Sequence, residues 1–204
     1  MRLPVWFLLL IAVAGCAIGP AQKDPPATYD LGAPHGYAPN QPRIRASLLV
    51  HNIAAPAWLD TTAIVYRLGY RDAGRQQVYA NSRWAATPGT LLAQRLRGRL
   101  AAASDGGIVN GADNVRPDCT LRIELDDFSQ VFDSAESSRV VVLARASLVN
   151  VGRRALQAQK SFSVERAAAT ANAEGGARAL ALASDELIED VTAWVAAVLA
   201  TEKK

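Results

Sequence analysis

The chain of 204 residues contains little of what a catalytic or metal centre is usually built from. It has two histidines, two cysteines and one methionine, and its aromatic residues make up only 6%. His35 and His51 are separated by a proline-rich segment, and their spacing does not suit a shared metal ion. No serine lies in a Gly-x-Ser-x-Gly motif, and the glycines of residues 106–111 lack the pattern of a phosphate-binding loop. The sequence therefore disfavours an enzyme and offers no metal or cofactor site.

An excess of charge of one sign is also missing. Lysine and arginine number 22 against 19 aspartates and glutamates, the net charge is +3, and the arginines are scattered along the chain. This balance does not favour a nucleic acid as partner. Half of the residues are apolar and a fifth are charged, which is typical of a globular protein with enough chain for one domain.

No apolar run is long enough to cross a membrane as a permanent helix. The run from Leu3 to Ala14 covers about 12 residues, whereas a spanning helix needs ~20. Arg2 precedes this run, and the small residues Ala14 and Gly15 end it. A short positive head, an apolar run and a small-residue exit are typical of a secretory signal, so residues 1–15 are predicted to be a signal peptide.

The sequence Val13-Ala14-Gly15-Cys16 resembles the lipobox of bacterial lipoproteins. In such signals the cysteine thiol is alkylated by diacylglycerol, the chain is cut before it, and the new amine is acylated. The resemblance makes Cys16 the predicted lipid attachment site, and its acyl chains would hold the protein at a membrane. Ala17 follows the cysteine where an inner-membrane sorting signal has aspartate, which favours the outer membrane. An ordinary signal peptide that contains a cysteine is the alternative.

The second cysteine, Cys119, has no partner within the chain if Cys16 carries lipid. The exported domain would then fold without an internal disulfide. We expect Cys119 to be a small buried residue at the start of a strand, and a bridge between two chains is the alternative.

Proline and glycine dominate the stretch that follows the signal. Residues 16–42 are predicted to be the lipidated cysteine and a tether stiffened by prolines, interrupted by one short extended piece at residues 29–32. Regular structure is expected to begin at Arg43, so that the folded domain covers residues 43–204.

Hydrophobic periodicity in this domain predicts strands and two helices. A turn is expected at residues 72–74, and a β-bulge near Asp126-Asp127 because the apolar parity changes there. One helix begins at Thr87-Pro88 and ends before residues 105–107, and another covers about 174–200. The expected strands are 43–50, 63–70, 76–84, 121–128, 139–149 and 156–166, with a short ambiguous piece in 108–115. The order predicts an α+β fold, an antiparallel sheet with two helices packed on one face.

Both helices are expected to carry their charged residues on a different face from their apolar residues. In the first helix the leucines at 92, 96 and 100 share one face, and Arg95 and Arg99 lie on another. In the second helix Asp185, Glu186 and Glu189 lie opposite the apolar stripe. Asp126 and Asp127 are expected on opposite faces of their strand, where they could not share a proton or a metal.

With these elements in place, the sequence resembles the ABC-type transport auxiliary lipoproteins, the PqiC/YmbA-like family. The resemblance covers most of the chain from residue 29 to the last helix. It rests on the lipobox at Cys16, Tyr29-Asp30-Leu31, Leu59-Asp60 leading into Ile64-Val65-Tyr66-Arg67, and Trp84-Ala85 before Pro88 and the leucine-rich helix.

The resemblance implies a small α/β domain similar to the N-terminal domain of TolB. It also implies a non-enzymatic, periplasm-facing lipoprotein that works with an ABC transporter and an MCE-domain protein to move lipids between the inner and outer membranes. A homo-oligomer is a further candidate arrangement. The alternatives are a structural or assembly lipoprotein of the envelope and, more remotely, a lipid carrier with its own cavity.

Three aromatic residues, Trp58, Tyr66 and Trp84, are candidates for a partner surface, because aromatic residues are enriched at interface hot spots. The alternative is that they are ordinary core residues.

Overall fold

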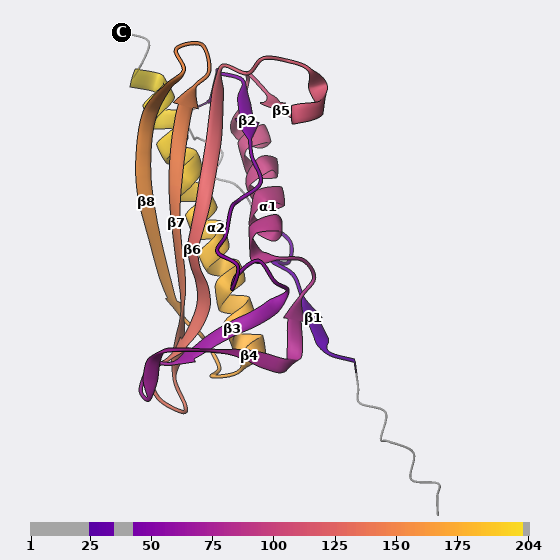
Figure 1. The fold of residues 1–204 in the computed structure, drawn as a ribbon, viewed down its shortest axis with the longest axis vertical. Helices are drawn as coiled ribbons and strands as arrows, with labels where there is room; N and C mark the ends of the chain where they lie inside the picture. Colours follow the sequence, from indigo (N-terminus) through magenta and orange to yellow (C-terminus); the bar gives the residue numbers. More distant parts are fainter. Residues whose placement is uncertain (1–24, 35–42, 202–204) are drawn as a thin grey trace, which may run out of the picture.

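The structure is a computed structural model that describes residues 25–34 and 43–201. It contains one sheet of eight strands, and two helices cover one face of that sheet (Figure 1). The α+β fold with both helices on one face is therefore confirmed. The helices are α1 (Pro88–Ala103) and α2 (Ala173–Thr201). The strands are β1 (Ala27–Tyr29), β2 (Leu48–Val50), β3 (Ala63–Leu68), β4 (Asp72–Trp84), β5 (Ile108–Val109), β6 (Cys119–Phe132), β7 (Ser138–Asn150) and β8 (Ala155–Ala167).

The sheet is mixed, whereas the sequence predicted a purely antiparallel one. Strands β6, β7 and β8 form an antiparallel meander, and β3 and β4 form an antiparallel hairpin. Both β2 and β3, however, run parallel to β6, and β1 runs parallel to β4. The reason is the crossover through α1, which carries the chain back so that β6 starts at the same end as β2.

Strand β6 is the centre of the sheet. Along one side it pairs with β7, and its other side is shared by β2 at Cys119–Leu121 and by β3 at Gln130–Phe132. Between β2 and β3, residues 55–62 lie outside the ladder and insert Leu59, 1% exposed, into the core. The register of β6 against β7 shifts between Leu125 and Asp127, which confirms the predicted bulge. Cys119, the first residue of β6, is buried, as expected.

The hairpin between β3 and β4 turns earlier than the sequence predicted. The turn occupies residues 69–71, and the Arg71 N–H donates to the Leu68 carbonyl at 2.9 Å. The predicted turn at residues 72–74 is therefore wrong, because these residues belong to β4. A Cβ at Gly69 would lie 3.1 Å from the carbonyl oxygen of Phe132, so the close approach to the end of β6 fixes where the chain reverses.

The folded domain also begins earlier than expected. Strand β1 pairs with Ser82–Trp84 of β4, and the Ala85 N–H donates to the Tyr29 carbonyl at 2.7 Å. Leu31 is only 5% exposed. The part of the predicted tether that covers residues 27–32 therefore belongs to the domain, and Cys16 lies outside the described residues.

Candidate functional site

The three aromatic candidates do not form one surface. Trp84 is 1% exposed and packs against Phe128 at 5.5 Å between ring centroids, so it is a core residue and not part of a partner surface. Tyr66 is half-buried and packs against Tyr79 at 4.6 Å. Trp58 is half-buried and contacts Arg67. Arg67 follows Tyr66 in β3, so the side chains of Arg67 and Tyr66 point to opposite faces of the sheet.

Trp58 belongs to a compact polar cluster that we name the Trp58 patch: Trp58, Arg67, Asp127 and Ser129. The Arg67 guanidinium lies 5.1 Å from the Trp58 ring centroid. It donates to Asp127 Oδ2 at 2.8 Å and to Ser129 Oγ at 2.6 Å. Because Phe128 packs in the core between them, Asp127 and Ser129 project from the face of β6 that carries no helix. Asp127 Oδ1 is buried and accepts no hydrogen bond from the described residues.

A surface cavity of about 440 Å³ adjoins the Trp58 patch. Pro56 and Trp58 line one side, and Glu124 and Asp126 line the other. The two neighbouring aspartates have different surroundings, since the Asp126 side chain is 53% exposed and the Asp127 side chain only 15%. The patch and its cavity can therefore present an aromatic ring and carboxylates to another protein.

On the opposite face, Tyr66 adjoins a buried polar cluster beneath the start of α2. The Tyr79 hydroxyl donates to Gln130 Oε1 at 2.9 Å, and Gln130 Nε2 donates to Ser138 Oγ at 2.7 Å. Burial, with a smaller contribution from Tyr66, raises the pKa of Tyr79 to about 12. A Cβ at Gly176 would lie 2.0 Å from Gln130 Oε1, so glycine allows α2 to approach the sheet here. This cluster is structural.

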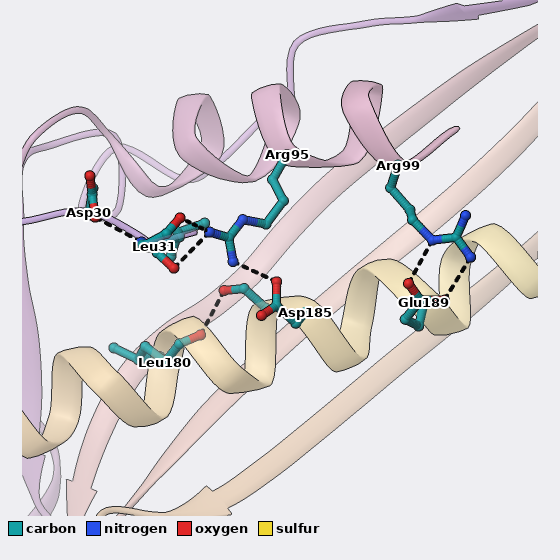
Figure 2. A network of polar contacts seen from close by, with 9 residues as sticks. Asp30, Leu31, Arg95, Arg99, Leu180, Asp185 and Glu189 are labelled. Carbon is teal, nitrogen blue, oxygen red and sulfur yellow. Dashed lines mark hydrogen bonds and ion pairs between the residues drawn. The ribbon is translucent and has the colours of Figure 1, made fainter. Parts of the chain in front are cut away.

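The N-terminal segment is fixed to both helices by one side chain, Arg95 of α1 (Figure 2). Its guanidinium donates to the Leu31 carbonyl at 2.7 Å, to the Gly32 carbonyl, and to Asp185 Oδ1 of α2 at 2.5 Å. The Arg95 side chain is 7% exposed and that of Asp185 18%. We name these residues, Leu31, Gly32, Arg95 and Asp185, the anchor junction.

One helical turn further along, a second ion pair joins the same two helices. Arg99 donates to the two carboxylate oxygens of Glu189 at 2.6 and 2.9 Å, and its side chain is 3% exposed (Figure 2). The sequence placed Arg95 and Arg99 on a different face from the leucines, and this face meets the acidic residues of α2. Two arginines four residues apart in α1 and two acidic residues four residues apart in α2 were a signal in the sequence for this pairing. The spacing alone does not identify which helix supplies the partner.

The cavities around these contacts differ greatly in volume. The apolar space between helices and sheet, lined by residues such as Leu92, Leu125 and Leu187, holds only about 10 Å³. Two surface cavities of about 350 and 490 Å³ flank the segment around Leu31. The interior cavity has no room for an acyl chain, which argues against a carrier that encloses lipid in this core.

A metal-binding cluster is not found among residues 25–34 and 43–201, since these contain no suitable group of three histidine, cysteine or acidic side chains. His51 is exposed, and His35 lies outside the described residues. In the same part of the chain, neither helix combines the length and the apolar character that a membrane span needs.

The family model of the ABC-type transport auxiliary lipoprotein component matches residues 29–192. The chain belongs to this family. The match begins in β1 and ends in α2, so it includes the anchor junction and the Trp58 patch of this auxiliary lipoprotein. Membership agrees with the resemblance to the PqiC/YmbA-like proteins and makes the protein an auxiliary component of ABC-type transport.

Solved structures with the same fold include XCC0632 from Xanthomonas campestris. It is 20% identical, the match covers 86% of this chain and 98% of that chain, and the TM-score is 0.73. The hypothetical protein CT253 from Chlamydia trachomatis is 7% identical, with 76% and 98% of the two chains covered and a TM-score of 0.52. At these identities the likeness shows the fold alone. No curated protein matches the auxiliary lipoprotein.

Proposed function

We propose that this auxiliary lipoprotein is a non-enzymatic accessory of an ABC transporter and an MCE-domain protein that move lipids between the inner and outer membranes. Cys16 carries the lipid, and the domain faces the periplasm from the outer membrane. The observation that carries the proposal is membership of the family over residues 29–192, from β1 into α2.

The anchor junction lets the lipid anchor limit the distance between the folded domain and the bilayer. Ten residues lie between Cys16 and Ala27, so a fully extended tether of eleven Cα–Cα steps reaches at most about 40 Å. Strand β1 is hydrogen-bonded to β4, and Arg95 fixes the residues that follow it. The tether therefore keeps Ala27, where the folded domain begins, within this distance of the bilayer.

Docking, not lipid carriage, is the role that suits the domain. Its interior cavity of about 10 Å³ does not accommodate an acyl chain. We propose the Trp58 patch as the surface that contacts the MCE-domain protein or the transporter. Tryptophan and arginine are among the residue types that most often dominate binding energy, and Trp58 and Arg67 supply both to the patch.

The anchor and the partner are tested separately. Mass spectrometry of the mature protein should show an acylated amino terminus at Cys16, and an unmodified amine with a free thiol would refute the anchor. Envelope fractionation then assigns the membrane, because recovery with the inner membrane would refute the outer-membrane location.

The partner is tested by cross-linking the full-length protein in intact cells and purifying it in detergent. We expect MCE-domain and ABC transporter subunits to be recovered with it. Trp58→Ala should reduce their recovery at least tenfold, whereas Tyr70→Ala, at an aromatic residue 43% exposed on the β3–β4 turn, should not. Recovery of outer-membrane assembly proteins alone would instead support an assembly lipoprotein.

A further inference from the structure

Strand β8 forms a long free edge of the sheet. It has 13 residues and pairs with β7, and no other strand of the described chain lies beyond it (Figure 1). The edge strands β1 and β5, by contrast, have three and two residues. A long edge presents a row of unpaired backbone N–H and C=O groups that another strand can bind.

Most of this edge is regular. The only register shift against β7 lies near Gln157, and from Ala158 to Ala167 the ladder is uninterrupted. The side chains of Ser161 and Ser163 on the helix-free face are small and exposed. Natural edges are usually protected by bulges, prolines or several charges. This stretch has no proline, one bulge at its end, and three charged residues of mixed sign, Lys160, Glu165 and Arg166.

The helix-covered side of the edge carries an aromatic pair. Phe162 of β8 packs edge to face against Trp194 of α2, with 5.9 Å between ring centroids. Phe162 is 6% exposed, while Trp194 is only half-buried at the flank of the helix. A strand added to β8 would cover both the free backbone groups and the remaining surface of Trp194.

We propose that the added strand is β8 of a second copy of this chain, antiparallel and centred on Phe162. Side-chain complementarity points to a second copy, because in this register no two like charges face each other and two phenylalanines meet at the centre. The facing pairs are Phe162 with Phe162, Ser161 with Ser163, Lys160 with Val164, Gln159 with Glu165 and Ala158 with Arg166.

Neighbouring registers are less favourable. Centring on Ser163 places Lys160 opposite Arg166 of the other copy, which is a like-charge pair. Centring on Ser161 places the bulged Gln157 opposite Glu165, inside the new ladder, whereas centring on Phe162 places it opposite Ala167, at the end of the ladder. Of these three registers, the one centred on Phe162 avoids a like-charge pair and keeps the bulge at the end of the ladder.

The test measures the mass of the mature full-length protein in detergent by native mass spectrometry and sedimentation at tens of micromolar. We expect a dimer. The double variant Ser161→Lys with Ser163→Lys places lysines opposite each other across the two-fold axis, and should weaken association roughly tenfold or more. The matched double variant Ser161→Glu with Ser163→Glu should do the same, and mixing the two should restore a mixed dimer.

A control pair, Val78→Lys with Ala80→Lys, changes exposed residues of β4 and should leave association unchanged. A monomeric wild-type protein would overturn the proposal, as would an oligomer that the β8 variants do not weaken, or one that only the β4 variant disrupts. Because neither the transporter nor the MCE-domain protein is present, failure here would leave the proposed transport role standing.

Discussion

Replacing Arg95 by methionine tests whether one side chain holds the N-terminal segment to both helices. The variant removes the donor to the Leu31 and Gly32 carbonyls and leaves Asp185 without this partner. Breaking a buried ion pair by removing one member costs about 3–5 kcal/mol. Because the Asp185 side chain is 18% exposed and water can reach it, we expect a loss near the lower limit, about 3 kcal/mol.

Urea unfolding measures this loss, and hydrogen exchange locates it. The Ala85 N–H, which donates to the Tyr29 carbonyl, should exchange much faster in Arg95→Met because β1 detaches more often. Arg178→Ala is the control. It removes an ion pair with Glu174 whose side chains are 76% and 51% exposed, and should cost less than about 1 kcal/mol.

A second variant separates the effect of breaking the ion pair from the effect of losing the carbonyl contacts. Adding Asp185→Leu to Arg95→Met replaces the whole ion pair by apolar groups, and should recover more than half of the lost stability. Exchange at Ala85 should stay fast, because the donor to Leu31 is still missing. A cost below about 1 kcal/mol for Arg95→Met alone, with unchanged exchange at Ala85, would refute the reasoning.

Two further predictions concern the buried polar cluster. Gly176→Ala should cost about 2–4 kcal/mol in urea unfolding, because the new Cβ displaces the Gln130 amide from its hydrogen bonds. The control Gly98→Ala, in α1 with open space around it, should be neutral or stabilising. Equal effects of the two substitutions would contradict the close packing of α2. Tyr79 should ionise with a pKa of about 12 in a spectrophotometric titration, and Tyr79→Phe should remove that step. Folding raises this pKa above 10.0, so the stability that depends on neutral Tyr79 is complete below pH 10 and is lost as the pH rises toward 12. Titration of every tyrosine near pH 10 would contradict this prediction.

The Arg95 and Arg99 pairs show what periodicity leaves undecided, namely what the polar side of a helix contacts. An amphipathic pattern divides a helix into an apolar and a polar side, and it assumes that the polar side meets water. In this protein α1 and α2 lie next to each other, so part of each polar side meets the other helix. Charges of opposite sign at matching intervals make that contact stable.

The sequence alone determined the features that depend on neighbouring residues. The position of α1 follows from Thr87-Pro88, the bulge near Asp126 from a change of apolar parity, and the burial of Cys119 from its place at the start of a strand. Each depends on backbone preferences or on side-chain alternation within a few residues. Such local rules predicted the order and class of nearly all elements.

The tertiary structure alone decided which of these elements meet. Three features join segments that are far apart in the chain: the parallel pairing of β2 and β3 with β6, the burial of Trp84, and the attachment of Leu31 through Arg95. Whether a strand is central or at an edge, and whether a charge meets water or another helix, depends on the free energy of the whole packed arrangement. No local pattern encodes that choice, because the same alternation of side chains is compatible with either neighbour.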